Sequence, residues 1–179
     1  MKKNEILELS KRKMLSFYNK YQNQRCVIIG NGPSLNKMDL SFLRNEYTFG
    51  MNKIYLGFDR FDFYPSFYVA VNQLVLEQSC KEIENLKCPK FLSHHGIPYF
   101  NDVFYKRTDT MFIQSIIDEK FSNNPLNGLW EGCTVTFVAM QLAYFMGFKE
   151  VYLIGVDHNF KDEGKPHEAV TATGDDINH

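Results

Sequence analysis

The strongest candidate for a ligand site is a glycine-rich turn that comes directly after a short apolar run. The run, residues 25–29, has the sequence RCVII and is typical of a buried strand. The turn that follows has the sequence GNGPSL and supplies the candidate binding residues Gly30, Asn31, Gly32, Pro33 and Ser34. Glycine lets the backbone turn sharply and lets a phosphate approach main-chain N–H groups. The turn therefore predicts a phosphate-bearing ligand, and the alternative is a structural turn that binds nothing.

This turn departs from the dinucleotide-binding fingerprint in two places. The position of the third glycine holds Leu35. An acidic residue that binds the ribose is expected about 20 residues further on. The chain has the neutral amide of Asn52 there instead. We therefore expect a nucleotide held by backbone amides and by the side chains of Asn31 and Asn52, and not NAD.

Two further groups of residues are placed to bind an anion or to take part in catalysis. Gly132, Cys133 and Thr134 precede a helical pattern, and the exposed N–H groups at a helix N-terminus attract negative charge. Asp157 follows the last apolar run, where a carboxylate can contact a ligand or take part in proton transfer. Each group has a structural alternative, which is capping of the helix for the first and capping of a helix or loop for Asp157.

Histidines gather near the end of the chain. Residues 157–179 hold three of the five histidines, namely His158, His167 and His179. Their spacing matches no zinc signature, so we predict no structural metal site, and the segment is either part of an active site or a solvated tail. Earlier in the chain, His94 and His95 follow an apolar run and precede a glycine, which favours a polar turn over a catalytic pair.

The elements that must position these residues follow from a pattern in which strands alternate with helices. Apolar runs typical of strands cover residues 25–29, 47–52, 66–71, 90–93 and 149–154. Helical spacing covers residues 2–20, 74–86 and 134–147, with Gly147 as the stop signal. This alternation predicts an α/β fold, a Rossmann-like open parallel sheet with helices on both faces and an amphipathic helix at the N-terminus.

We divide the chain into an N-terminal helix, residues 1–22, and a Rossmann-like nucleotide-binding domain, residues 23–179. Within this domain, residues 97–131 are aromatic and polar without a sustained period, and we expect them to form a lid or a long excursion. The last predicted strand is followed by a polar segment with no closing helix or strand. We therefore expect the chain to be truncated at its C-terminus.

Composition and charge exclude several classes of protein. The chain has 179 residues with 20 Lys+Arg against 21 Asp+Glu, and this balance does not favour a nucleic-acid partner. We find no apolar stretch that could span a bilayer and no signal-peptide centre. The four cysteines show no paired spacing, which favours a cytoplasmic protein. The aromatic share of 15% fits either a packed core or the interface of a homo-oligomer.

Taken together, the motifs resemble the motility accessory factor and 6-hydroxymethylpterin diphosphokinase MptE-like family of bacteria and archaea. The resemblance is carried by GNGPSL at 30–35, GMN at 50–52, GCT at 132–134 and YLIGVD at 152–157. The same order of motifs is similar to that of the small bacterial sialyltransferases that use CMP-sialic acid. The resemblance covers about residues 25–179 and leaves out the N-terminal helix.

The resemblance implies a nucleotide-dependent transferase, most directly a glycosyltransferase of surface polysaccharide biosynthesis that uses a CMP-activated or similar sugar. In the sialyltransferases, asparagines that match Asn31 and Asn52 hold the nucleotide. The residue at the helix start, here Cys133 or Thr134, does so as well. Their general base is a histidine after the last motif, the region in which His179 lies. A glycan would be the acceptor, no metal would be needed, and the protein would act in the cytoplasm at the inner face of the membrane.

Two alternatives remain open. The first is an ATP-dependent 6-hydroxymethyl-7,8-dihydropterin diphosphokinase, in which Mg²⁺ would neutralise the triphosphate and a pterin would be the acceptor. In that case Asp157, Asp175 and Asp176 would be the metal ligands. The second alternative is a non-catalytic nucleotide-binding module of a larger protein.

Overall fold

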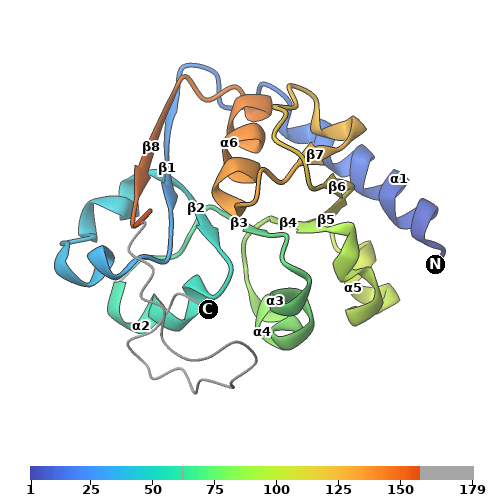
Figure 1. Ribbon diagram of the computed structural model, residues 1–179, viewed down its shortest axis with the longest axis horizontal. Helices are drawn as coiled ribbons and strands as arrows, with labels where there is room; N and C mark the ends of the chain where they lie inside the picture. Colours follow the sequence, from blue (N-terminus) through green and yellow to red (C-terminus); the bar gives the residue numbers. More distant parts are fainter. Residues whose placement is uncertain (62, 158–179) are drawn as a thin grey trace.

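The centre of the molecule is a sheet of six strands in which every neighbouring pair runs parallel (Figure 1). The computed structural model describes residues 1–61 and 63–157. The strands are β1 (Arg25–Ile29), β2 (Tyr47–Met51), β3 (Phe67–Ala70), β4 (Lys90–Ser93), β5 (Thr110–Ile113) and β8 (Glu150–Ile154). Helices cover both faces of the sheet, which confirms the predicted α/β fold class.

The order of the strands creates a switch in direction beside β1. The order across the sheet is β5-β4-β3-β2-β1-β8, so the chain builds the sheet to one side of β1 and then returns to its other side. Ile29 at the end of β1 pairs with Gly50 on one side and with Ile154 on the other. In open α/β sheets, ligands bind outside the carboxyl ends of the strands at such a switch point. The turn after β1 lies at this point.

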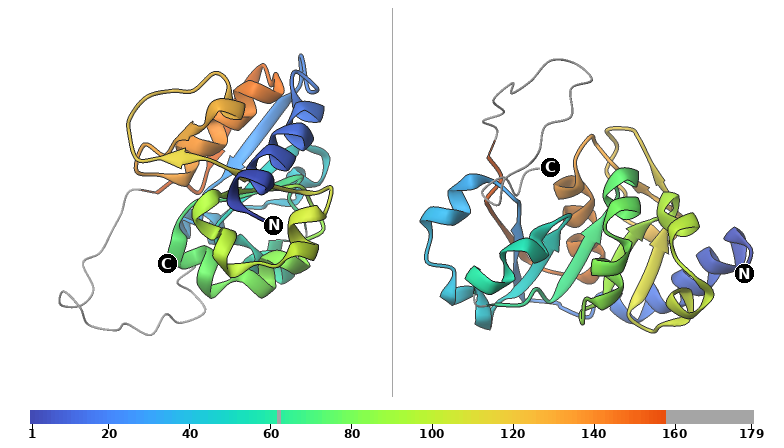
Figure 2. Two further views of the ribbon diagram at one scale, coloured as in Figure 1. Left: turned by 90° about the vertical axis from the view of Figure 1, so that its right-hand side faces the viewer. Right: turned by 90° about the horizontal axis from the view of Figure 1, so that it is seen from below.

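Two apolar cores lie on the two faces of the sheet, because successive side chains of a strand point to opposite sides. Val27 and Ile29 belong to the core that also holds buried residues of α3 (Gln73–Gln78), α4 (Cys80–Asn85) and α5 (Asp102–Lys106). Cys26 and Ile28 belong to the other core, which α6 (Val135–Met146) covers. Figure 2 shows α6 and the group of α3, α4 and α5 on opposite sides of the sheet.

The predicted strands agree with the structure to within one residue at each end, whereas two predicted helices are shorter than expected. The segment 74–86 is not one helix, because Ser79, with a ψ of 18°, separates α3 from α4. The N-terminal helix α1 (Lys3–Met14) ends before residue 20 and continues only as a 3-10 turn. A further short helix, α2 (Phe58–Phe61), follows β2. The long helix α6 ends as predicted at Gly147, which has the left-handed φ of 88°.

Helix α1 packs along β5, the edge strand of the sheet (Figure 2). The hydroxyl oxygen of buried Ser10 accepts a hydrogen bond of 2.9 Å from the backbone N–H of Phe112 and donates one of 2.8 Å to the carbonyl of Ile6. Lys13 donates from its ammonium to three backbone carbonyls, those of Tyr105, Arg107 and Thr110. An uncovered edge strand invites pairing with another chain, so α1 protects this edge of the sheet.

Removing the Ser10 hydroxyl tests how much the contact between α1 and β5 contributes to stability. Ser10→Ala leaves the buried N–H of Phe112 without a partner, so we expect the free energy of unfolding to fall by about 1–3 kcal/mol. Ser16→Ala is the matched control, because this serine is exposed and donates only to the carbonyl of Lys13 on its own helix end. Urea denaturation measures both variants. If both variants lost the same free energy of unfolding, the role assigned to Ser10 would be wrong.

Residues 97–131, expected as a lid or excursion, contain part of the main sheet. α5 and β5 lie in this segment, and β5 pairs with β4 over its whole length. The remainder holds a separate two-stranded parallel ribbon of β6 (Ser115–Ile116) and β7 (Leu129–Trp130). The expectation missed β5 because no glycine or proline follows its short apolar run, whereas the equally short β4 is followed by His94, His95 and Gly96.

A buried amide of α6 anchors the rest of this segment. Gln141 is fully buried, and its side-chain oxygen accepts hydrogen bonds from the N–H groups of Ser122 (2.9 Å) and Trp130 (3.2 Å). Its side-chain nitrogen donates to the carbonyls of Trp130 and Phe137. Both the oxygen and the nitrogen of the Gln141 side chain are therefore hydrogen-bonded. Through these bonds Gln141, which interrupts an apolar stretch of α6, holds the loop that precedes the helix.

Candidate functional site

The glycine-rich turn is held tightly against the end of β8. The N–H of Gly30 donates to the carbonyl of Ile154 (2.8 Å), and that of Gly32 donates to the carbonyl of Gly155 (2.7 Å). A Cβ atom on Gly30 would lie 2.2 Å from the Gly155 oxygen, and one on Gly32 would lie 2.6 Å from the same oxygen. The two glycines are required because two backbone turns touch. Their N–H groups are used within the protein, so they do not face a phosphate.

Asp157 joins the same two turns. Its carboxylate accepts hydrogen bonds from the backbone N–H of Ser34 (2.7 Å) and from the Ser34 hydroxyl (2.8 Å). These bonds cap the 3-10 helix that begins at Pro33, directly after the glycines. The structure thus brings Ser34 and Asp157 together across 123 positions of sequence. Both carboxylate oxygens already hold the turn in place, as the capping alternative expected.

Two asparagine side chains at the ends of β1 and β2 carry buried oxygens without a partner. Asn31 donates from its side-chain nitrogen to the carbonyl of Met51 (3.1 Å), which brings the turn after β1 beside the end of β2. The side-chain oxygens of Asn31 and Asn52 are buried and accept no hydrogen bond within the described residues. An unpaired buried acceptor costs about 1–3 kcal/mol. A ligand that donates N–H or O–H groups to these oxygens would remove that cost.

The backbone around Asn52 has an uncommon conformation. Asn52 has a φ of 48°, in the left-handed region that asparagine tolerates better than most residues. Its carbonyl accepts a hydrogen bond of 2.6 Å from the hydroxyl of Tyr68, a residue that our sequence analysis did not select. The signal for this contact is a tyrosine within a fully buried strand, because a buried hydroxyl needs a hydrogen-bond partner.

The N-terminus of α6 lies at the same edge of the sheet. The other end of this helix, Gly147, lies against Asn19 before β1 begins, so the helix runs antiparallel to the strands and starts near their carboxyl ends. Thr134 is the N-cap, and its hydroxyl accepts a hydrogen bond from the N–H of Thr136 (3.3 Å). Gly132 and Cys133 precede it in the left-handed region, and the Cys133 side chain is exposed. Capping and an anion site are compatible here, because the Thr134 O–H still has its proton to donate.

His94 and His95 form a turn after β4. Their rings lie 4.0 Å apart, and Nδ1 of His94 accepts a hydrogen bond from the N–H of Ser115. Burial, together with the neighbouring His95 and Lys3, lowers the pKa of His94 to about 4. This imidazole is neutral at pH 7 and a weak base, which fits the polar turn that the sequence favoured.

Several predicted site residues lie outside the described part of the chain. These are His179, Asp175 and Asp176, together with His158 and His167. Among residues 1–61 and 63–157, no group of three or more His, Cys, Asp or Glu side chains is arranged to hold a metal ion. No helix in the same ranges is long and apolar enough to cross a bilayer.

A cavity of about 700 Å³ lies elsewhere in the molecule. Leu15, Tyr18 and Asn19 line it on one side, and Tyr144 and Phe148 line it near the end of α6. None of the predicted site residues contributes to it. The candidate site therefore rests on the paired turns and the two asparagine oxygens, and not on the volume of a cavity.

A model of the 6-hydroxymethylpterin diphosphokinase MptE-like family matches residues 3–163. The solved structure of the MAf glycosyltransferase from Magnetospirillum magneticum AMB-1 is similar with a TM-score of 0.52 and 17% sequence identity. The match covers 92% of this chain and 30% of that chain. Because the sequence identity is only 17%, the likeness concerns the fold alone. No curated protein matches the sequence.

Proposed function

Because the chain belongs to the 6-hydroxymethylpterin diphosphokinase MptE-like family, we propose that it is a nucleotide-dependent transferase. We assign it to glycosyl transfer in surface polysaccharide biosynthesis, with a CMP-activated or similar sugar as donor and a glycan as acceptor. The fold likeness to a MAf glycosyltransferase supports this choice, although the chain spans only 30% of that protein's length.

The observation that carries the proposal is the pair of unpaired buried oxygens on Asn31 and Asn52. A carbonyl oxygen accepts hydrogen bonds and cannot donate them, so a ligand that binds to these two oxygens has to supply the donors. CMP has an amino group on its base and two hydroxyls on its ribose. Since the N–H groups of Gly30 and Gly32 are used internally, the asparagines are better suited to the nucleoside than to its phosphate.

The phosphate has a separate candidate partner at the start of α6. The N–H groups of Gly132 and Thr134 already donate to the carbonyls of Asp118 and Glu131, so the attraction for an anion comes from the Thr134 hydroxyl and the positive end of the α6 dipole. We propose that Thr134, Cys133 and Gly132 face the phosphate of the donor. This arrangement would stabilise the negative charge that the leaving CMP develops.

In the proposed reaction, an acceptor hydroxyl attacks the anomeric carbon of the donor sugar. The bond between that carbon and the phosphate oxygen breaks, and CMP leaves with the electron pair. The hydroxyl proton passes to a general base, for which a histidine is suited because its pKa lies near the working pH. We assign this role to His179, which lies outside the described residues, and we limit Asp157 to positioning the turn at Ser34.

The diphosphokinase reading is the second candidate, and the description of the matched family favours it. It requires Mg²⁺ with carboxylate ligands. Of the three expected ligands, Asp157 already accepts two hydrogen bonds from Ser34. Asp175 and Asp176 lie outside the described residues. Because the Asp157 carboxylate is already engaged with Ser34, the described geometry gives the diphosphokinase less support than it gives glycosyl transfer.

Thermal stability with added nucleotides separates these functions. A ligand that binds only the folded state at 100 times its Kd stabilises that state by about 2.7 kcal/mol. We expect CMP with EDTA to raise the melting temperature of the wild-type protein. A rise with ATP and Mg²⁺ alone would favour the diphosphokinase. No rise with either ligand would contradict a nucleotide site in this chain and favour a purely structural module.

Asn52→Gly tests the site directly. We expect this variant to lose most of the stabilisation by CMP, because it removes the amide while glycine keeps the left-handed turn. Asn23→Gly is the matched control, since Asn23 is an exposed asparagine with a φ of 62° that precedes β1 at the opposite edge. If Asn52→Gly binds CMP as well as Asn23→Gly does in isothermal titration, the site is wrongly assigned.

A further inference from the structure

We propose that Tyr68 is a positioning residue of the nucleotide site. Its buried hydroxyl holds the left-handed turn at Asn52, and this turn directs the Asn52 side chain to the ligand. The inference rests on the proposed function, because it assigns a role within the same site. Tyr68 would act through Asn52 and would not touch the nucleotide.

The hydroxyl of Tyr68 is buried in an apolar core, and it makes one specific hydrogen bond there. The side chain is fully buried on β3, in the core that also holds Ile29 and Ile54. Its hydroxyl donates to the carbonyl of Asn52 at 2.6 Å, and it has no second hydrogen bond within the described chain. Burial raises the pKa of Tyr68 well above its usual value, so the hydroxyl keeps the proton that it donates. A phenylalanine would fill the same space without that bond.

The peptide groups around Asn52 are fixed from three directions. The N–H of Asn52 donates to the carbonyl of Val69 (3.2 Å), and Asn31 donates to the carbonyl of Met51 (3.1 Å). Tyr68 completes the set at the Asn52 carbonyl. A residue other than glycine stays in the left-handed region only when its surroundings hold it there. Without the Tyr68 hydroxyl, the Asn52 carbonyl loses its partner and the residue can return to a negative φ.

Tyr68→Phe tests the proposal against a matched control. Tyr105 is also buried in the same core, and its hydroxyl donates to the carbonyls of Ile97 (2.6 Å) and Phe100 (2.5 Å), away from the site. Tyr68→Phe and Tyr105→Phe should both lower the melting temperature. We expect only Tyr68→Phe to raise the Kd for CMP, by about tenfold, as for the loss of one well-placed hydrogen bond.

The Asn52→Gly background shows whether Tyr68 acts through Asn52. Once the Asn52 side chain is absent, adding Tyr68→Phe should leave the Kd for CMP unchanged, because coupled residues have non-additive effects. A further tenfold rise in that background would overturn the proposal, since Tyr68 would then act by another route. Titration calorimetry of the two single variants and the double variant completes this cycle.

The conformation of Asn52 gives a measurement that needs no nucleotide. A positive φ brings the Hα and amide proton of a residue close together, so wild-type Asn52 should give a strong intraresidue cross-peak in nuclear Overhauser spectra. We expect Tyr68→Phe to weaken this peak and Tyr105→Phe to preserve it. If the wild-type protein binds no CMP, the proposed function fails, and this measurement alone decides the role of Tyr68. An unchanged peak in Tyr68→Phe overturns that role in either case.

Discussion

Gly30→Ala is expected to lower the free energy of unfolding by about 3 kcal/mol or more, the upper range for overpacking. The added Cβ would lie 2.2 Å from the oxygen and 2.8 Å from the carbon of the Gly155 carbonyl. Both atoms belong to the backbone and cannot rotate away. The turns after β1 and β8 would have to separate, which would also stretch the 2.8 Å hydrogen bond from Gly30 to Ile154.

Gly96→Ala serves as the control for this substitution. Its Cβ would meet the Leu76 side chain, with the Cδ1 atom nearest at 2.9 Å, and the end of a leucine side chain can move. We expect a clearly smaller loss of stability in urea denaturation. If both variants lost the same free energy, the contact between the two turns would not be the reason for glycine at position 30.

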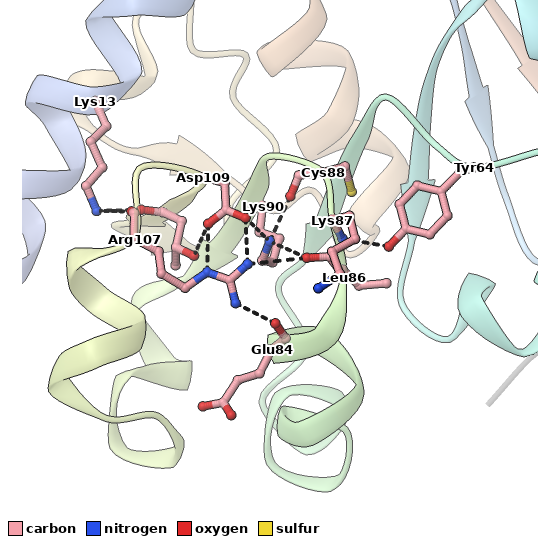
Figure 3. A network of polar contacts seen from close by, with 10 residues as sticks. Lys13, Tyr64, Glu84, Leu86, Lys87, Cys88, Lys90, Arg107 and Asp109 are labelled. Carbon is pink, nitrogen blue, oxygen red and sulfur yellow. Dashed lines mark hydrogen bonds and ion pairs between the residues drawn. The ribbon is translucent and has the colours of Figure 1, made fainter.

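Asp109→Ala is expected to cost about 3–5 kcal/mol, because it leaves the fully buried ammonium of Lys90 without its partly buried counter-charge. Figure 3 shows the Asp109 carboxylate between two cations. It accepts from the ammonium of Lys90 at 2.8 Å and from the guanidinium of Arg107 at 2.7 Å. The Lys90 side chain is fully buried and also donates to the carbonyls of Leu86 and Cys88. Without Asp109, two neighbouring cations would remain without a counter-charge.

Lys90→Met provides the matched comparison. It removes the buried charge, keeps a side chain of similar length and leaves Asp109 paired with Arg107. Replacing a buried charge with an apolar side chain is often close to neutral when no charge is left unpaired. We therefore expect a loss well below that of Asp109→Ala. A larger loss for Lys90→Met would contradict the view that the carboxylate neutralises both cations.

The same network predicts how stability changes with pH. Burial alone would raise the pKa of Asp109, but hydrogen bonds from Arg107 and Lys90 outweigh burial and lower it below its usual value. A lowered carboxyl pKa contributes stability that is present above the unfolded pKa and is lost as the pH falls through the folded pKa. The advantage of the wild-type protein over Asp109→Ala should thus be complete above about pH 5 and shrink on further acidification. An advantage that stayed constant down to pH 2 would contradict this assignment.

The sequence determined the elements whose signals are local. β1 and β4 have the predicted bounds, because each is an apolar run that ends at a turn signal. α6 ends at Gly147, because glycine readily adopts the left-handed conformation that ends a helix. The motifs also identified the family, since they combine residue types with spacing. These features depend on residues that are neighbours in the chain.

Tertiary structure decided which of these residues meet. Asp157 contacts Ser34, and the carbonyl of Gly155 meets Gly30, only because β8 pairs with β1 at the edge of the sheet. The N–H groups of Gly30 and Gly32, which the sequence predicted to face a phosphate, donate instead to the carbonyls of Ile154 and Gly155. The pairing of β2 with β3 likewise brings Tyr68 to Asn52. Periodicity gives the buried face of a strand but not its neighbours, so the partners of buried polar groups follow from the order of strands in the sheet.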